Sequence, residues 1–458
     1  MRKLITSLAV LATVAVPAKA DVMVDATTFP DERFRNWILS QSWGCDGVLT
    51  DQEIANVDEI NVSYTAVRNL KGVEYFSSLR TLDCGACGYL TTLDVSRNTA
   101  LEYLDCRCTK LTTLDVSQNT ALKFLNCGEA LVEKLSVLDV TNNTALETLY
   151  CYCNHLTELD LSQNTALKRL DCDNNQLTSL DISQNKALQE LDCYENQLTS
   201  LDVTQNTALQ ILYCYNNELT SLDVSQNNTA LIWLDCHNNE LTTLDVSRAT
   251  ELYHLSCYNN QLTSLTLSSS TVLKELYCYN NQLTTLDVSQ NKRLQYLRCY
   301  NNQLTSLDVS EVSDLKILLC YDNQLTSLCV SRENWQITRL ECYNNYINAY
   351  YMNSLAESLP SVRNGASFVP MIFIENTEEH NVCTPTAVTT AVAKGWRVYA
   401  KTGEYESVEY NGSAPSDIST ITAPIDDLSV PRYNLNGQRV GAGASGVIIH
   451  NGRKYIVR

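Results

Sequence analysis

The sequence predicts a solenoid, a parallel β arc of about thirteen coils with little helix, between a helical N-terminal cap and an α/β C-terminal cap. The first observation is an internal repeat, L-x-x-L-x-C-x-x-N-x-L-T-x-L-D-V-S-x-N-T-A, which mostly returns every 21 or 22 residues. A unit this short has no partner of its own to bury against, so successive units must stack. The second observation is a cysteine at the sixth position of each unit: Cys84, Cys106, Cys127, Cys151, Cys172, Cys193, Cys214, Cys236, Cys257, Cys278, Cys299, Cys320 and Cys342.

Each half of the repeat has its own pattern. The segment L-x-x-L-x-C alternates as a strand, with leucine and cysteine pointing inward. The asparagine that follows lies in a turn, where a buried amide can satisfy backbone groups of neighbouring coils. The second half, L-T-x-L-D-V, is again strand-like, with Leu201 and Val203 inward in one coil, and it leaves no room for an outer helix. We therefore expect two strand faces, with an insertion at 129–134 in the third coil.

This repeat resembles that of the leucine-rich repeat proteins and covers residues 79–349. The cysteine occupies the position where those proteins place an inward leucine, so the resemblance implies a column of reduced core thiols that pack as small hydrophobes. Six cysteines fall outside the column. Of these, Cys87 and Cys108, on adjacent coils, are the first pair to test for a disulfide bridge.

Residues 21–78 precede the repeats and predict a helical cap. Helical spacing over 29–39 turns Phe34 and Ile38 inward, and a second helix begins at Thr50, followed three residues on by Glu53 as in a capping box. The helix–loop–helix resembles an EF-hand, but its first and third loop positions are Ser42 and Gly44, which are poor calcium ligands. We expect a degenerate, metal-free cap, similar to the one that begins the internalins, bacterial adhesins with leucine-rich repeats.

The two ends of the chain carry further segments. Residues 1–20 read as a cleaved signal peptide, with a charged start, an apolar stretch and the small-residue site Ala18-Lys19-Ala20. After the repeats, residues 350–410 predict an α/β cap, residues 411–428 a linker, and residues 429–458 a tail of strands broken by glycines. The cap should contain helices at 352–359 and 384–394 and strands at 371–374 and 396–399. The tail resembles the C-terminal sorting tails of Bacteroidetes surface proteins, which implies a secreted or surface location.

Several functions are excluded by composition and motifs. The formal charge is −19, or −22 once three cations leave with residues 1–20, and no basic stripe interrupts it, so we expect no nucleic-acid partner. After the signal no run of about 18 apolar residues exists, so we expect no transmembrane segment. The five histidines lack metal-ligand spacing, and no nucleophile, phosphate or dinucleotide motif occurs, so we expect no enzyme, cofactor or metal. We read His237 and His254 as surface variation.

Recognition is expected on the outward face of the L-x-x-L-x-C strands, where residues vary from coil to coil while inward positions hardly change. Rigid aromatic side chains with polar tips dominate recognition surfaces, although a regular tyrosine column could also reflect stacking alone. The opposite face carries a column of aspartates, whose like charges must be offset by serine and threonine hydroxyls or backbone amides, or else by cations; we expect the hydrogen bonds. We expect a monomeric, non-enzymatic protein-binding adhesin, with glycan binding as the alternative. The candidate ligand-binding residues are Tyr150, Ile211, Tyr213, Tyr215, Trp233, His254, Tyr258, Tyr277, Tyr279, Tyr296, Arg298, Tyr300 and Ile317.

Overall fold

The computed structural model describes residues 21–129, 134–227, 230–362, 365–372, 379–403, 406–412 and four strands between 432 and 457. The signal peptide, most of the expected insertion and most of the expected linker lie outside the described residues. The chain divides into two compact units, Met1–Leu294 and Gln295–Arg458, which are described separately. None of the helices in the described ranges is long and apolar enough to cross a membrane.

The first unit begins with the predicted helical cap. Helix α1 (Glu32–Leu39) starts at Asp31, whose carboxylate accepts hydrogen bonds from two backbone amides of the first turn, and it buries Phe34 and Ile38 as expected. Helix α2 (Asp51–Asn56) starts with the predicted capping box. The Glu53 carboxylate accepts from the backbone nitrogen of Thr50 at 2.8 Å and from its hydroxyl at 2.7 Å. Ahead of each helix lies a short strand, β1 (Val22–Met23) and β2 (Val48–Leu49), and the two pair antiparallel.

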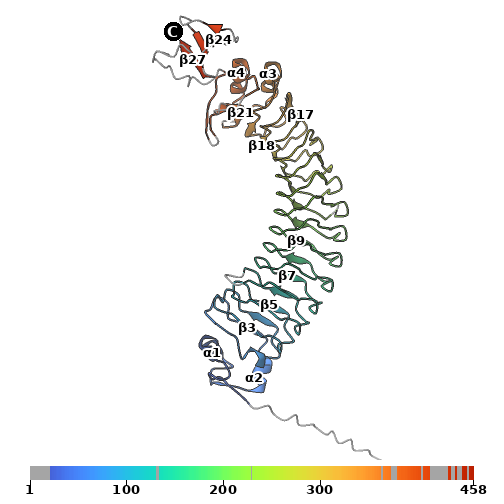
Figure 1. Ribbon diagram of the computed structural model, residues 1–458, viewed down its shortest axis with the longest axis vertical. Helices are drawn as coiled ribbons and strands as arrows, with labels where there is room; N and C mark the ends of the chain where they lie inside the picture. Colours follow the sequence, from blue (N-terminus) through green and yellow to red (C-terminus); the bar gives the residue numbers. More distant parts are fainter. Residues whose placement is uncertain are drawn as a thin grey trace, which may run out of the picture. The chain divides into compact units, whose positions relative to one another are not determined.

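A parallel sheet of three-residue strands lines the first unit, confirming the predicted solenoid (Figure 1). The central residue of each strand, Ile60 in β3 and a leucine in the others, is buried, and burying one such side chain contributes about 2 kcal/mol. A short 3₁₀ helix, η1 (Val73–Tyr75), lies between the first two strands. The strands in order are β3 (Glu59–Asn61), β4 (Thr81–Asp83), β5 (Tyr103–Asp105), β6 (Phe124–Asn126), β7 (Thr148–Tyr150), β8 (Arg169–Asp171), β9 (Glu190–Asp192), β10 (Ile211–Tyr213), β11 (Trp233–Asp235), β13 (His254–Ser256) and β15 (Glu275–Tyr277).

The thirteen repeat cysteines are buried, as predicted, and all are free thiols. Burial raises the pKa of these thiols well above the ordinary value in most coils, for example at Cys193 and Cys214. Cys87 and Cys108 are also free and have separate partners. The Cys87 thiol donates to the carbonyl of Val62 at 3.1 Å, and the Cys108 thiol donates to the Glu129 carboxylate at 3.1 Å.

Thiol reagents should therefore label few of the thirteen repeat cysteines in the native protein and most of them after denaturation. The reason is that the reacting species is the thiolate, which burial disfavours and shields. Cys45 and Cys329 are exposed and serve as internal positive controls. The measurement is mass spectrometry of labelled peptides, and rapid native labelling of most repeat cysteines would refute the inward column.

Two columns of buried asparagines hold successive coils together. The predicted column is typified by Asn217, whose amide nitrogen donates to the carbonyls of Cys193 and Cys214, at 3.0 and 3.2 Å, while its oxygen accepts from the Leu198 amide at 3.0 Å. The second column, which the sequence reading did not single out, is the asparagine of S-x-N-T-A. Asn206, fully buried, donates to the carbonyls of Ile182 and Asn185, at 3.0 and 2.9 Å. Both columns donate to backbone carbonyls of the preceding coil, and in the second column the carbonyls of Ile182 and Asn185 also accept from the turn amides of Asn185 and Leu188.

The second halves of the coils depart from prediction. In the described residues they form strands only at β12 (Thr243–Asp245) with β14 (Ser264–Thr266), and at β17 (Ser306–Asp308) with β19 (Ser327–Cys329). The expectation of a second strand face was therefore wrong for most coils, whose second halves are turn or irregular backbone. The Asp carboxylate accepts from the amide two residues on in coils with and without these strands, at Asp245 and at Asp202, so this contact does not prevent strand pairing. The inward placement of Leu201 and Val203 is nevertheless confirmed.

The second unit continues with parallel strands and a mixed cap. Strands β16 (Tyr296–Arg298), β18 (Ile317–Leu319) and β20 (Arg339–Glu341) are followed in the same sheet by β21 (Ser367–Ile372), β22 (Arg397–Lys401) and the antiparallel β23 (Ser407–Glu409). Helices α3 (Ala349–Ser358) and α4 (Pro385–Ala393) match the predicted helices closely, although α3 begins three residues early, at Ala349, with Asn348 as its N-cap.

Strand β21 begins earlier than predicted, because Pro370 does not end it. Proline cannot donate to a ladder and is tolerated at bulges, and the register of β21 against β22 shifts between Phe368 and Met371. The predicted strand end at 373–374 lies outside the described residues. The tail forms a four-stranded antiparallel sheet in the order β25 (Arg439–Val440), β24 (Arg432–Asn434), β26 (Gly446–His450) and β27 (Arg453–Val457).

Candidate ligand-binding surface

The outward face of the parallel sheet in the first unit is set by strand register. Residues before and after each central leucine point away from the core, and parallel pairing aligns them coil by coil. One row runs from Ile211 through Trp233 to His254, and the row beside it runs from Tyr213 through Asp235 and Ser256 to Tyr277. Most of the candidate residues are half-exposed on this face: Tyr150, Ile211, Tyr213, Tyr215, Trp233, Tyr258, Tyr277 and Tyr279 in the first unit, and Tyr296, Arg298, Tyr300 and Ile317 in the second.

The aromatic residues that follow the cysteines stack into a continuous column, here called the tyrosine column: Tyr194, Tyr215, His237, Tyr258 and Tyr279. Successive ring centroids are 4.2–4.4 Å apart, and successive planes deviate by at most 14°. His237, read from sequence as surface variation, occupies the middle of this column, and its Nδ1 lies 2.5 Å from the Asp235 carboxylate. The second unit has a similar stack of Tyr300, Tyr321 and Tyr343.

A second aromatic group surrounds Trp233. The ring of His254 stacks on Trp233 with centroids 3.9 Å apart, and the rings of Tyr213 and Tyr277 flank this pair at 6.3 and 5.4 Å. His254 is only 6% exposed, so the reading of this residue as surface variation was wrong. Its Nδ1 lies 2.9 Å from the Glu275 carboxylate, which also accepts from the Tyr277 hydroxyl at 3.2 Å. Burial lowers the pKa of His254, and the hydrogen bond to Glu275 opposes this effect.

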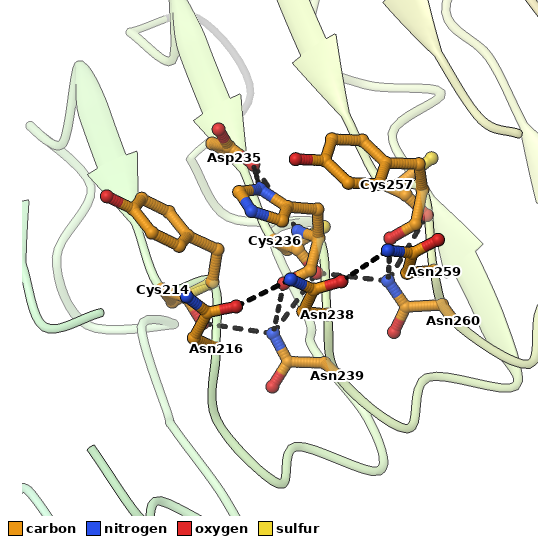
Figure 2. A network of polar contacts seen from close by, with 12 residues as sticks. Cys214, Asn216, Asp235, Cys236, Asn238, Asn239, Cys257, Asn259 and Asn260 are labelled. Atoms are coloured by element: carbon orange, nitrogen blue, oxygen red, sulfur yellow. Dashed lines mark hydrogen bonds and ion pairs between the residues drawn. The ribbon is translucent and has the colours of Figure 1, made fainter. Parts of the chain in front are cut away.

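A third column, missed in the sequence reading, runs beside the tyrosine column (Figure 2). Asn238 donates its side-chain amide to the oxygen of Asn216 at 2.6 Å, Asn259 donates to Asn238, and Asn280 donates to Asn259, both also at 2.6 Å. These asparagines adopt left-handed backbone conformations, with φ between 52° and 54°. Asparagine tolerates this conformation better than most residues, so the repeated N-N pair after C-Y was the available signal.

The aspartate column on the other side of the coils has a local explanation. Asp202 accepts from the backbone amide of Thr204 and from its hydroxyl, at 2.9 and 2.6 Å, and the corresponding carboxylates repeat this contact with Ser or Thr two residues on. These hydrogen bonds lower the pKa of Asp202. The expectation that hydroxyls and amides offset the like charges is confirmed. Across the described ranges, no three His, Cys, Asp or Glu side chains are placed to share a metal ion.

Comparisons with known proteins agree with this geometry. The leucine-rich repeat family matches residues 144–185 and 271–313, whereas no curated protein sequence matches the chain. The functional domain of InlJ from Listeria monocytogenes, described as including a cysteine ladder, is 30% identical over 78% of this chain and 84% of its own, with a TM-score of 0.61.

Two more distant structures share the fold alone. The internalin InlF of Listeria monocytogenes is 19% identical over 86% of this chain and 100% of its own, with a TM-score of 0.53. The ectodomain of the Arabidopsis receptor kinase HAESA, in complex with a peptide hormone ligand, is 19% identical over 65% of this chain and 59% of its own, with a TM-score of 0.54.

Proposed function

Because the chain belongs to the internalin-like leucine-rich repeat proteins, we propose that it is a non-enzymatic adhesin that binds a protein ligand through the aromatic face of its parallel sheet. The observation that carries this proposal is the contact between Tyr213, Trp233, His254 and Tyr277. Stacking fixes these rings before any ligand arrives, so little side-chain entropy is lost on binding. Rigid aromatic anchors of this kind dominate protein recognition.

A glycan ligand is the alternative, but the stacking of the aromatic rings disfavours it. Sugar rings pack on open aromatic faces, but in the tyrosine column each inner ring is covered on both faces by its neighbours, 4.2–4.4 Å away. The column therefore offers ring edges and hydroxyl groups. Hydroxyl groups in fixed positions suit the amides and carbonyls of a polypeptide.

The proposed setting is the cell surface or the extracellular space, reached through the signal peptide at 1–20, with the protein acting as a monomer. The N-terminal pattern and the basic tail support export. Comparing the N-terminal sequence of the exported protein with Asp21, and measuring its mass in solution, would test both points.

The binding face is tested by two alanine substitutions in the mature protein, once a ligand is captured from host extracts or on a glycan array. Trp233→Ala should weaken binding by about 2 kcal/mol or more, roughly 30-fold in Kd, because it removes a central anchor. Asp223→Ala, on the aspartate column, is the control and should leave Kd nearly unchanged. Titration calorimetry with parallel melting curves measures both. If the aspartate change weakens binding more at equal stability, the proposed face is the wrong one.

A further inference from the structure

Acidic residues interrupt two rows of the outward face, the strand row that contains Tyr213 and the row of residues after the cysteines, at the adjacent coils of Cys172 and Cys193. In the strand row, Tyr150 is followed by Asp171 and Asp192 before Tyr213, and the register places these residues side by side. In the row after the cysteines, Asp173 follows Tyr152, and backbone hydrogen bonds connect the Tyr152, Asp173 and Tyr194 positions from coil to coil. An acidic break, defined here as Asp171, Asp173 and Asp192, thus lies inside the aromatic face with tyrosines on both sides.

These carboxylates are poorly solvated. Asp173 is only 4% exposed, and the Oδ1 atom of Asp192 is buried with no hydrogen-bond partner in the described part of the chain. Burial, with the charges of Glu190 and Asp173, raises the pKa of Asp192 to about 7. The pKa of Asp171 is also raised, by burial first and then by its contact with Asp173. Like charges directly opposite each other on paired strands are destabilising.

Two other buried carboxylates have an arginine beside them, whereas Asp322 accepts from the Asn344 amide instead. Arg107 lies 3.6 Å from Asp105, and Arg339 lies 2.6 Å from Glu341. Beside the acidic break Arg169, which shares strand β8 with Asp171, lies 3.5 Å from the Glu190 carboxylate instead. Among the described residues, no lysine or arginine forms an ion pair with the three carboxylates of the break. In the described residues these carboxyls are offset by protonation, which their raised pKa values favour, and not by a lysine or arginine of the chain.

We propose that the acidic break receives a lysine or arginine side chain of the protein partner, held between the tyrosines that border it. This inference rests on the proposed function and adds the chemistry of the partner, a basic polypeptide segment. The carboxylates supply the counter-charge, and the rings of Tyr150 and Tyr213 can contact the aliphatic stem or the cationic head. Charge complementarity of this kind selects partners and sets orientation on a recognition surface.

The probe is blocked tetralysine, with blocked tetraglutamate as the negative control, titrated into the full mature chain at low salt. The double variant Asp171→Asn/Asp192→Asn should weaken tetralysine binding about tenfold, because it removes the two carboxyls that ionise when the cation binds. The matched control is Asp181→Asn/Asp202→Asn, which makes the same two carboxyl-to-amide changes on the aspartate column of the same coils. It should weaken binding less than about twofold, as exposed charges contribute little.

Calorimetry in two buffers of different ionisation enthalpy measures the number of protons released on binding. Diffuse electrostatic attraction would not cause such a release. At pH 7 the binding of tetralysine should release protons, because the cation displaces protons from carboxyls of raised pKa. Equal weakening in both double variants, no proton release, or no binding by the native protein would overturn the inference. Affinity measurements with a captured partner distinguish the proposed binding face from the proposed basic segment. If Trp233→Ala weakens binding and Asp171→Asn/Asp192→Asn does not, only the basic segment is refuted.

Discussion

Replacing Asn217 by alanine is expected to lower the free energy of unfolding by about 3 kcal/mol, a large effect for one polar side chain. Its amide donates to the carbonyls of Cys193 and Cys214 and accepts from the backbone nitrogen of Leu198. Alanine leaves all three buried backbone groups without this partner, and each unsatisfied group costs about 1–3 kcal/mol, reduced by any water that enters. The shift of the urea midpoint measures the loss.

The neighbouring residue supplies a matched control. Asn216 has a left-handed φ of 53°, and its side-chain oxygen accepts only from the Asn238 amide near the surface. Asn216→Gly keeps a residue suited to this backbone conformation and removes only that hydrogen bond, so the cost should stay below about 1 kcal/mol. A similar loss from both substitutions would show that the buried asparagine column does not hold the coils together as described.

The repeat made most of this fold predictable. Because the chain repeats itself, inward positions such as Leu212 and Cys214 stand out against outward neighbours that vary, and both are fully buried. The position of the asparagine after the cysteine was equally informative, because a polar residue at a fixed place in a core needs a backbone partner. The strand pairing beyond the last repeat was less predictable, because Pro370 in β21 looks like a strand breaker until a bulge accommodates it.

The candidate surface was only partly predictable, for a different physical reason. Alternation tells which residues point outward but not how their rings turn about the side-chain bonds. His254 occupies an outward position in β13, and yet it is buried because Trp233 lies flat against it, 3.9 Å away. Stacking between adjacent coils likewise brought His237 into the tyrosine column. Such contacts depend on pairs of residues about 21 positions apart, which single-position patterns do not reveal.

Replacing Asp192 by asparagine is expected to stabilise the protein at neutral pH. The pKa of this carboxyl is raised to about 7 in the folded chain, whereas an unfolded chain releases the proton near pH 4. The carboxyl therefore contributes its full stability below about pH 4, and that contribution is lost as the pH rises toward 7. A neutral amide avoids the loss, and the gain at pH 8 should be about 1–2 kcal/mol after a discount for partial solvation.

Urea unfolding at pH 8 and at pH 4 measures this effect, with Asp181→Asn as the control. Hydrogen bonds from Ser183 lower the pKa of Asp181, so its contribution has the opposite sign: it is present above about pH 4 and lost in acid. Asp181→Asn should therefore lose stability at pH 8, where Asp192→Asn gains it. An equal gain from Asp192→Asn at both pH values would mean that packing, and not ionisation, is responsible. If the stabilised Asp192→Asn protein also binds tetralysine more weakly, the carboxylate is retained at a cost to the fold, as expected for a residue that serves binding.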